Sequence, residues 1–393
     1  MKWLCDLSYV VLSFCGAFNM KRVLAFLFAV SATLWMAAPA AAWNNDSSAP
    51  GSVLVFPKFR QGTVTTTDQG VQPRTEFEIS VVCPTDPSYT CAPDQPVSLK
   101  GHYVCQYNCM SQVDFTVGTT INGTLYLTFE SPTSVYLPGA TFIPAPDCSG
   151  GQGYLIVYVI DAYGNPIKFD GLIGGATLRG GPQSFQNCPT CKAKYQAIAI
   201  QAGDNIPTGL STDDPANGGN GNGAMDFDGN EYRQVTGTTL GIVQYEGLTF
   251  ANATTQLAGT PHSGFIQNEL TLLTLDVKGL NQSNPDLFVP INFYNEGQLG
   301  QSTVRDIVCY ETRRIIFDTP GPDNTFGRKG LVVAGPARFD DVNTGTPASL
   351  LGLIEVQEGS YVEVTGAETT LRWVADAMHA NGTTVATTFV QGP

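Results

Sequence analysis

A stretch crowded with glycine, asparagine and aspartate, Asn217–Glu231, is the part of this sequence best suited to hold a ligand. Oxygen-bearing side chains alternate there with glycines, which let a loop curl around a hard cation such as Ca²⁺ and its about six to eight oxygen ligands. The sequence therefore predicts a calcium site, and the alternative is a flexible, solvated loop. The residues that would supply the ligands are Asp213, Asp214, Asn220, Asn222, Asp226, Asp228 and Glu231.

This stretch does not follow the EF-hand pattern. If Gly223 is taken as the turn glycine, the first ligand position falls on Gly218 and the last on Gly229, and neither carries a side-chain oxygen. A cation bound here would therefore need a different arrangement of ligands.

The cysteines offer a second kind of chemistry. Cys188 and Cys191 are spaced as in redox dithiols and zinc knuckles, and Cys105 and Cys109 could add two thiolates to a tetrahedral site. The sequence favours the alternative, structural disulfides in an exported protein. Haem attachment is excluded because Lys192, and not histidine, follows Cys191.

The number of cysteines on each side of the Gly/Asn stretch suggests a bridge across it. After residues 1–42, which are interpreted below as a signal peptide, seven cysteines lie before the stretch and only Cys309 lies after it, so we expect Cys309 to pair with the first half. The alternatives are a free thiol and a bond to another molecule. The full set of predicted disulfide cysteines is Cys83, Cys91, Cys105, Cys109, Cys148, Cys188, Cys191 and Cys309.

No local motif predicts catalysis. The three histidines, His102, His262 and His379, have no second histidine at a metal-ligand spacing, and no serine stands in a Gly-x-Ser-x-Gly elbow. Two carboxylates for glycoside cleavage would leave no local signature. We therefore assign no catalytic residues, and a glycan-active enzyme is the third of three hypotheses.

The start of the chain predicts export. Lys21 and Arg22 precede the apolar run Val23–Met36, and the small residues of Ala38–Ala42 offer a cleavage site, so residues 1–42 are interpreted as a signal peptide. We expect the true start at Met20. Neither this run nor an earlier apolar run, Leu7–Phe18, reaches the ~20 residues that span a bilayer, so no transmembrane segment is expected. The predicted location is extracellular or the bacterial cell surface.

Composition excludes one class of partner and indicates a fold class. The net charge is −14 with only 14% charged residues, so nucleic acid is not an expected partner. Runs such as Phe77–Val81 and Tyr154–Ile160 read as strands, and Ser52–Phe56 reads as a strand that ends at Pro57. We predict an all-β, disulfide-bridged, β-sandwich-like fold. Further strands are expected at Leu270–Val277, Leu287–Phe293, Val304–Tyr310, Leu331–Ala334 and Leu350–Val356.

Two Asn-Gly dipeptides predict β-hairpins, because this pair tolerates the positive φ angles of a type I′ turn. Val113–Ile121 and Thr124–Phe129 flank Asn122-Gly123. Leu371–Ala380 and Thr383–Val390 flank Asn381-Gly382.

The low apolar content between Asp204 and Tyr232 divides the sequence after the signal peptide into three regions. We expect a β region at 43–205, a loop or linker at 206–232, and a second β region at 233–393. If Cys309 bridges back, the halves form one large domain or two interlocked domains.

Three segments resemble those of an uncharacterised group of secreted bacterial β-rich proteins. Gly51–Pro57 matches a Gly-Ser-x-Leu-x-Phe-Pro strand, Asn165–Asp170 matches an Asn-Pro-Ile-x-Phe-Asp segment, and Glu231-Tyr232 matches a Glu-Tyr pair after an Asp/Asn-rich stretch. The resemblance implies bacterial export and brings no catalytic residues.

The first functional hypothesis is a non-enzymatic structural or surface protein that self-assembles, as a filament or surface-layer subunit. Trp43–Phe59 and Thr383–Pro393 are apolar enough to add to a neighbour's sheet edge, and the alternative is that both pair within their own sheet. The second hypothesis is a Ca²⁺-dependent carbohydrate-binding or adhesion protein, because aromatic residues, 10% of the chain, can stack on sugars.

Overall fold

The structure is a computed structural model, and from Asn45 to Pro393 the chain forms one compact unit, apart from Met1–Asn44. Apart from one 3₁₀ turn, η2 (Pro215–Asn217), the regular elements among the described residues are β-strands. In the same part of the chain, no helix is long and apolar enough to cross a membrane. The described residues are 49–61, 74–106, 108–131, 134–136, 143–144, 146, 148, 151–179, 192–223, 225–227, 229–233, 240–244, 254–257, 260–275, 286–294, 300–308, 310–314, 330–334, 338–339, 349–362 and 367–377.

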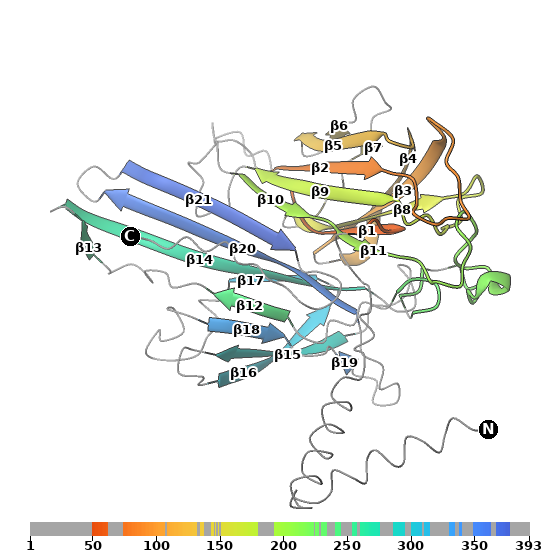
Figure 1. Ribbon diagram of the computed structural model, residues 1–393. Helices are drawn as coiled ribbons and strands as arrows, with labels where there is room; N and C mark the ends of the chain where they lie inside the picture. Colours follow the sequence, from red (N-terminus) through yellow and green to blue (C-terminus); the bar gives the residue numbers. More distant parts are fainter. Residues whose placement is uncertain are drawn as a thin grey trace, which may run out of the picture. The chain divides into compact units, whose positions relative to one another are not determined.

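The first half of the chain builds two antiparallel sheets, which we name sheet I and sheet II (Figure 1). Sheet I has the strand order β11 (Ile198–Ile200), β1 (Val53–Arg60), β8 (Gln152–Ile160), β3 (Pro96–Cys105) and β4 (Asn108–Thr120). Sheet II has the order β10 (Lys192–Gln196), β9 (Leu172–Arg179), β2 (Arg74–Val81), β5 (Thr124–Ser131), β6 (Ser134–Tyr136) and β7 (Ile143–Pro144).

The second half builds two more antiparallel sheets, sheet III and sheet IV. Sheet III contains β12 (Leu240–Gln244), β18 (Gly330–Ala334), β15 (Asp286–Tyr294) and β16 (Gly300–Val308), with β19 (Arg338–Phe339) beside β15. Sheet IV contains β13 (Thr254–Leu257), β14 (Thr260–Leu275), β20 (Ser349–Val362) and β21 (Ala367–Ala377), with β17 (Tyr310–Arg314) beside β14.

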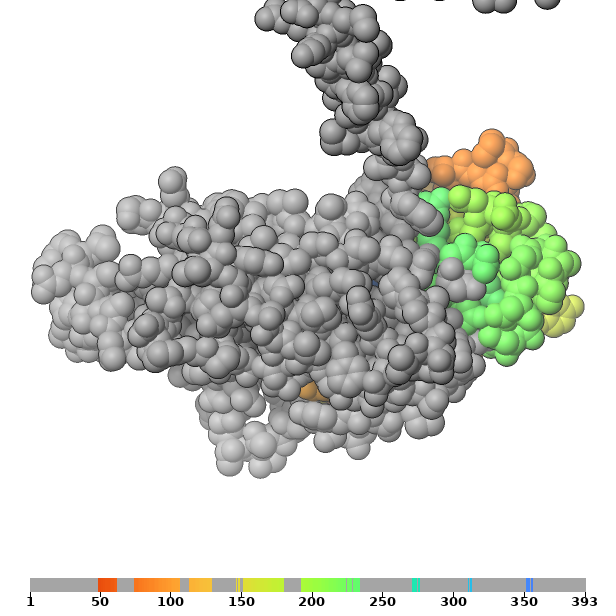
Figure 2. All heavy atoms as spheres, turned by 90° about the horizontal axis from the view of Figure 1, so that it is seen from below, coloured from red at the N-terminus to blue at the C-terminus, as the bar shows by residue number. Residues whose placement is uncertain are grey.

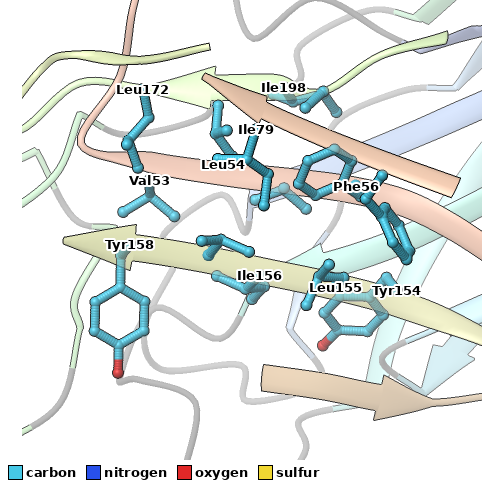
Figure 3. Packing of buried hydrophobic residues seen from close by; sticks show 14 of the residues in the cluster. Val53, Leu54, Phe56, Ile79, Tyr154, Leu155, Ile156, Tyr158, Leu172 and Ile198 are labelled. Atoms are coloured by element: carbon cyan, nitrogen blue, oxygen red, sulfur yellow. The ribbon is translucent and has the colours of Figure 1, made fainter. Parts of the chain in front are cut away.

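Sheets I and II pack face to face through aromatic and aliphatic side chains. Phe56 of β1 meets Phe77 of β2 edge to face, with ring centroids 5.1 Å apart, and Tyr103 of β3 lies 6.4 Å from Phe77. Figure 3 shows side chains of β1 and β8 gathered with Ile79, Leu172 and Ile198 in this core. Two sheets that bury alternate residues against each other form a β-sandwich. The predicted all-β, sandwich-like fold is confirmed.

β1 is buried on both faces. Every residue from Val53 to Arg60 is buried, and β1 pairs with β11 on one side and β8 on the other. The Val53–Phe59 part of the N-terminal segment is therefore an interior strand of its own sheet. Residues 43–48 and Thr383–Pro393 lie outside the described residues.

β1 also continues past Pro57, where the sequence predicted its end. The register with β8 shifts between Phe56 and Phe59, so Pro57 stands in a bulge. Proline has no N–H to give to the ladder, and a bulge is one of the few places in a sheet that accepts it.

The predicted hairpin at Asn122-Gly123 is wrong, although the turn is present. β4 pairs with β3 in sheet I, whereas β5 pairs with β2 in sheet II, so the turn carries the chain from one sheet to the other. Asn122 has a positive φ of 61°, but the Asn122 N–H donates to Val81 O. A turn dipeptide sets the local backbone and does not choose the strand partners.

A second predicted strand is also divided. Val304–Tyr310 contributes to β16 in sheet III and to β17 in sheet IV. Of the second predicted hairpin, Leu371–Ala377 is found in β21, and Thr383–Val390 lies outside the described residues.

Two disulfides fasten the first half. Cys83 bonds Cys91 and Cys105 bonds Cys148, with Cα–Cα distances of 5.9 and 5.2 Å. The structural interpretation of these four cysteines is confirmed, and a thiolate metal site that uses Cys105 is excluded. Among the other predicted disulfide residues, the Cys109 side chain and all of Cys188, Cys191 and Cys309 lie outside the described part.

Candidate functional site

Residues 204–233, which we call the polar loop, are attached to sheet I at a partly buried aspartate, Asp170. Ser52 Oγ donates to Asp170 Oδ1 at 2.7 Å and accepts from the N–H groups of Phe169 and Asp170. The Ala202 N–H, just before the loop, donates to the same Asp170 oxygen at 2.9 Å. Burial raises the pKa of Asp170, and these hydrogen bonds oppose that rise.

The end of the polar loop, at Tyr232, returns to Ala202, just before the start of the loop. Ala202 and Tyr232 form an isolated β-bridge, and the Gly203 N–H donates to Glu231 O at 2.8 Å. The Tyr232 ring is fully buried, lies 5.4 Å from Phe227, and accepts a hydrogen bond at its Oη from Thr212 Oγ1. The loop is thus closed at its base.

This base brings together the three segments on which the predicted resemblance rests, Gly51–Pro57, Asn165–Asp170 and Glu231-Tyr232. Gly51 and Leu172 exchange backbone hydrogen bonds of 3.0 and 2.8 Å, which joins the first segment to the residues that follow the second. Lys168 Nζ, from the second segment, donates to Gly203 O at 2.9 Å, beside the Glu231-Tyr232 pair. Their shared role in the structure is to hold the polar loop on the sandwich.

Inside the loop, three carboxylates surround two asparagines. Asp226 Oδ2 accepts from the side-chain amides of Asn220 and Asn222, the latter at 3.0 Å. Asp213 accepts from the Asn222 N–H at 3.0 Å. Glu231 accepts from the Asn220 N–H at 3.2 Å and from the Asp226 N–H at 3.1 Å. The carboxylates therefore hold the loop in shape through its own amide groups.

The predicted cation ligands are only partly brought together. Asp213, Asn220, Asn222, Asp226 and Glu231 form the network described above, whereas Asp214 caps η2 by accepting from the Ala216 N–H at 2.9 Å. Asp228 lies outside the described residues. Within the part of the chain that the structure describes, no three or more His, Cys, Asp or Glu side chains are arranged to hold a metal ion. The calcium site stays a prediction.

A disulfide loop lies beside the polar loop. Asp86, between Cys83 and Cys91, accepts from Thr208 Oγ1 at 2.6 Å and from Ser88 Oγ at 2.7 Å. The hydrogen bonds from Ser88 and Thr208 lower the pKa of Asp86 to about 2. Figure 2 shows orange atoms, from the part of the chain that contains the Cys83–Cys91 loop, next to the green atoms of the part that contains the polar loop.

A tight turn presents an exposed aromatic ring near the same base. Asp161 Oδ1 accepts from the N–H groups of Tyr163 and Asn165, both at 2.8 Å, and Gly164 has a φ of 92° that favours glycine. Tyr163 is 92% exposed on this braced turn. The turn closes onto the sheet through the Ile160–Pro166 bridge, and Ile167 bridges to Ser211 of the polar loop.

A hydrogen-bonded trio on sheet I was not predicted as a unit. His102 Nδ1 lies 2.5 Å from Asp114 Oδ1, and His102 Nε2 lies 2.8 Å from Tyr158 Oη. Burial lowers the pKa of His102, against the effect of Asp114, and burial raises the pKa of Tyr158. The trio links three neighbouring strands of sheet I, β4, β3 and β8.

The pH dependence of the free energy of unfolding should report the protonation state of the Glu231 side chain. Burial, with Asp226 and Asp213 nearby, raises the pKa of Glu231 to about 7, although two backbone N–H groups lower it. The protonated side chain of Glu231 therefore stabilises the folded state. This contribution to the free energy of unfolding is fully present below the pKa of the unfolded state and is lost as the pH rises through about 7. We expect Glu231→Gln to remove part of the loss of stability between pH 5 and pH 8.

Urea unfolding of both proteins at the two pH values measures this effect. Asp94→Asn, at an exposed position outside the loop, is the control and should leave the pH dependence unchanged. An equal pH dependence in Glu231→Gln and the unsubstituted chain would contradict the assignment.

A methyl group at Gly203 should open the base of the loop. A Cβ there would lie 1.9 Å from Asn230 O, a backbone atom that cannot move without shifting the loop. We expect Gly203→Ala to destabilise the protein by about 1–3 kcal/mol, as overpacking usually does, and to speed proteolysis within residues 204–233. Gly118→Ala is the matched control, since its added Cβ would have no atom within 4 Å.

Comparison with known proteins does not assign the chain to a family. No family model matches the chain, and no curated protein matches it. Among solved structures, the chain is similar to the CupB6 tip adhesin from Pseudomonas aeruginosa with a TM-score of 0.11 and 7% identity, over 84% of this chain and 99% of that one. A similarity of this size carries no argument about fold or function.

Proposed function

We propose that this chain is an exported protein with a non-enzymatic, structural or adhesive role outside the cell or on its surface. One observation carries the proposal: loops at one end of a disulfide-linked sandwich are braced into a fixed polar surface. The loops that join the strands of a sandwich gather at its ends, where such proteins commonly bind their partners.

Because these loops are held by their own hydrogen bonds, they are better suited to bind a partner in a fixed shape than to move during function. The polar loop is closed by the Ala202–Tyr232 bridge, and its carboxylates accept from its own amides. The adjoining turn holds Tyr163 in the solvent. A surface that is ordered before a partner arrives loses less entropy on binding, and a tyrosine offers a flat face together with a hydroxyl.

The disulfides support export. Cys83–Cys91 and Cys105–Cys148 lie in the first half, and such bonds persist in oxidising compartments. The signal peptide predicted at 1–42 agrees with that location.

Fractionation of the native host and binding assays test the proposal. We expect the mature chain in the extracellular or surface fraction, with both disulfides intact in non-reducing peptide maps. We also expect the purified chain to bind host-surface material or a glycan array, and Tyr163→Ser to weaken that binding without unfolding the protein. A chain recovered with reduced cysteines in the cytosol would overturn the proposal.

Calcium-dependent carbohydrate binding is a second candidate, favoured by the carboxylates of Asp213, Asp226 and Glu231 around two asparagines. Burial, and to a smaller extent the charges of Asp226 and Asp213, raise the pKa of Glu231, and a cation would offset those two charges. We then expect Ca²⁺ to raise the melting temperature relative to EDTA, as any ligand specific for the folded state does, and Asp226→Asn to abolish the rise. An unchanged melting temperature would remove this candidate.

A further inference from the structure

The outer edge of sheet I is formed by a long strand. β4 spans Asn108–Thr120 and, among the described strands, pairs with β3 alone. Its last eight residues, Val113–Thr120, pair with β3 in unbroken register, because both register shifts come before them. A strand at an edge offers a row of backbone N–H and C=O groups that another strand can pair with.

The end of this edge, Phe115–Thr120, lacks the usual protection against pairing. Natural edge strands are protected by lysine, proline, β-bulges or inward-pointing charges. In β4 both register shifts and the single charged residue, Asp114, whose carboxylate lies 2.5 Å from His102 Nδ1 on β3, come before Phe115. Phe115–Thr120 contains no lysine, no proline and no charged residue.

After Asp114, the exposed residues of β4 are small and uncharged. Phe115 and Val117 are buried, whereas Thr116 and Gly118 between and after them are exposed. A Cβ added at Gly118 would have no atom within 4 Å. From Phe115 to Thr120 the edge is uncharged and rich in threonine.

One segment of the chain fits this edge in length and chemistry. Thr383–Val390, outside the described residues, is an eight-residue stretch, Thr-Thr-Val-Ala-Thr-Thr-Phe-Val, without a charge. Its length equals that of the regular part of β4, and Thr–Thr pairs across strands are favourable. The last described strand before it, β21, already packs against β10, so a strand returning along β21 would have to share that surface.

We propose that Thr383–Val390 of a second copy adds to the edge of β4, so that copies of this chain join by strand addition. The inference deepens the proposed structural role and rests on it. Main-chain hydrogen bonds supply the affinity in such additions, and alternate side chains supply the specificity. A chain that donates one segment and accepts another through a different edge links head to tail.

Light scattering during size-exclusion chromatography of the mature, oxidised chain tests the inference. We expect the unaltered chain to associate at micromolar concentration, and both Gly118→Lys and a chain that ends at Gly382 to be monomeric. Thr124→Lys, which adds the same charge at an exposed position of the interior strand β5, is the matched control and should still associate.

A labelled peptide of residues 380–393 tests the donated segment and the β4 edge separately. It should bind the chain that ends at Gly382, and Gly118→Lys in that chain should weaken the binding by at least about tenfold, with circular dichroism unchanged. A monomeric unaltered chain, association that survives the truncation, or equal binding of the peptide to both chains would overturn the inference. A monomer found on the cell surface that still binds its partner would leave the proposed function standing.

Discussion

Replacing Glu355 with glutamine is expected to lower the free energy of unfolding by about 3–5 kcal/mol, because breaking a buried ion pair leaves charge without a partner. Lys58 Nζ donates to Glu355 Oε2, and an Arg60 N–H group lies 3.0 Å from Glu355 Oε1. The Lys58 and Glu355 side chains are 0% exposed, and that of Arg60 is 7% exposed. Glutamine keeps the shape of the side chain and removes its charge, so the loss reports the electrostatic contribution.

Denaturant unfolding followed by circular dichroism measures this loss, and a surface ion pair supplies the control. Glu76 accepts from Arg179 at 2.6 Å, and both side chains are about a third exposed. Exposed pairs contribute about 0–1 kcal/mol, so Glu76→Gln should change little. Similar losses in the two variants would contradict the buried network.

The same variant tests how the two halves are joined. Lys58 lies in β1 of sheet I and Glu355 in β20 of sheet IV, 297 residues apart in the chain. Near them, Tyr154 of β8 stacks on Tyr310 of β17 with ring centroids 6.0 Å apart. If these contacts couple the halves, the unaltered chain unfolds in one transition, and Glu355→Gln should separate it into two.

Removing the Cys105–Cys148 bond by a double change to serine should lower the unfolding free energy by about 4 kcal/mol. The bond closes 43 residues, and the chain-entropy relation gives a contribution of that size for such a loop. It also joins the end of β3 to a residue outside the regular strands, so its loss frees the connection between β7 and β8.

The second disulfide provides a quantitative comparison. Cys83–Cys91 closes only 8 residues, for which the same relation gives about 2.5 kcal/mol. Serine pairs at each bond, measured in the same denaturant series, should therefore rank in the order of loop length. A larger loss at Cys83 and Cys91 would indicate that packing of the loop on Phe169, through Tyr89, outweighs the chain entropy.

Strands could be predicted from the sequence because alternation and apolar runs depend on neighbours along the chain. Phe77–Val81 and Tyr154–Ile160 both lie in strands of the structure. Their partners could not be predicted, because pairing depends on which buried face each strand completes. The Asn122-Gly123 turn illustrates the difference, since the Asn122 N–H donates to Val81 O and Gly123 O accepts from the Val81 N–H, and Val81 is far from the turn in sequence.

The candidate site, too, could be predicted from the sequence only in part. Composition alone showed that oxygen-bearing residues crowd between Asp213 and Glu231. It could not show that Asp214 serves a 3₁₀ cap, or that Asp213 and Glu231 accept from the loop's own amides. The His102–Asp114 contact left no local signal, since no strand was predicted at His102, and only the β3–β4 register places the two residues opposite each other.

The sequence by itself determined the β class of this protein, the structural role of the four cysteines in its two disulfides and the position of its polar loop, since each depends on residue type and local spacing. The tertiary structure alone decided which strands share a sheet, that two of the three resembling segments are joined through Asp170, and that Lys58, Arg60 and Glu355 form one buried network. These features arise where residues up to 297 positions apart meet. Such contacts form only when the sheets pack together and exclude water, so the stability that they provide depends on the whole fold.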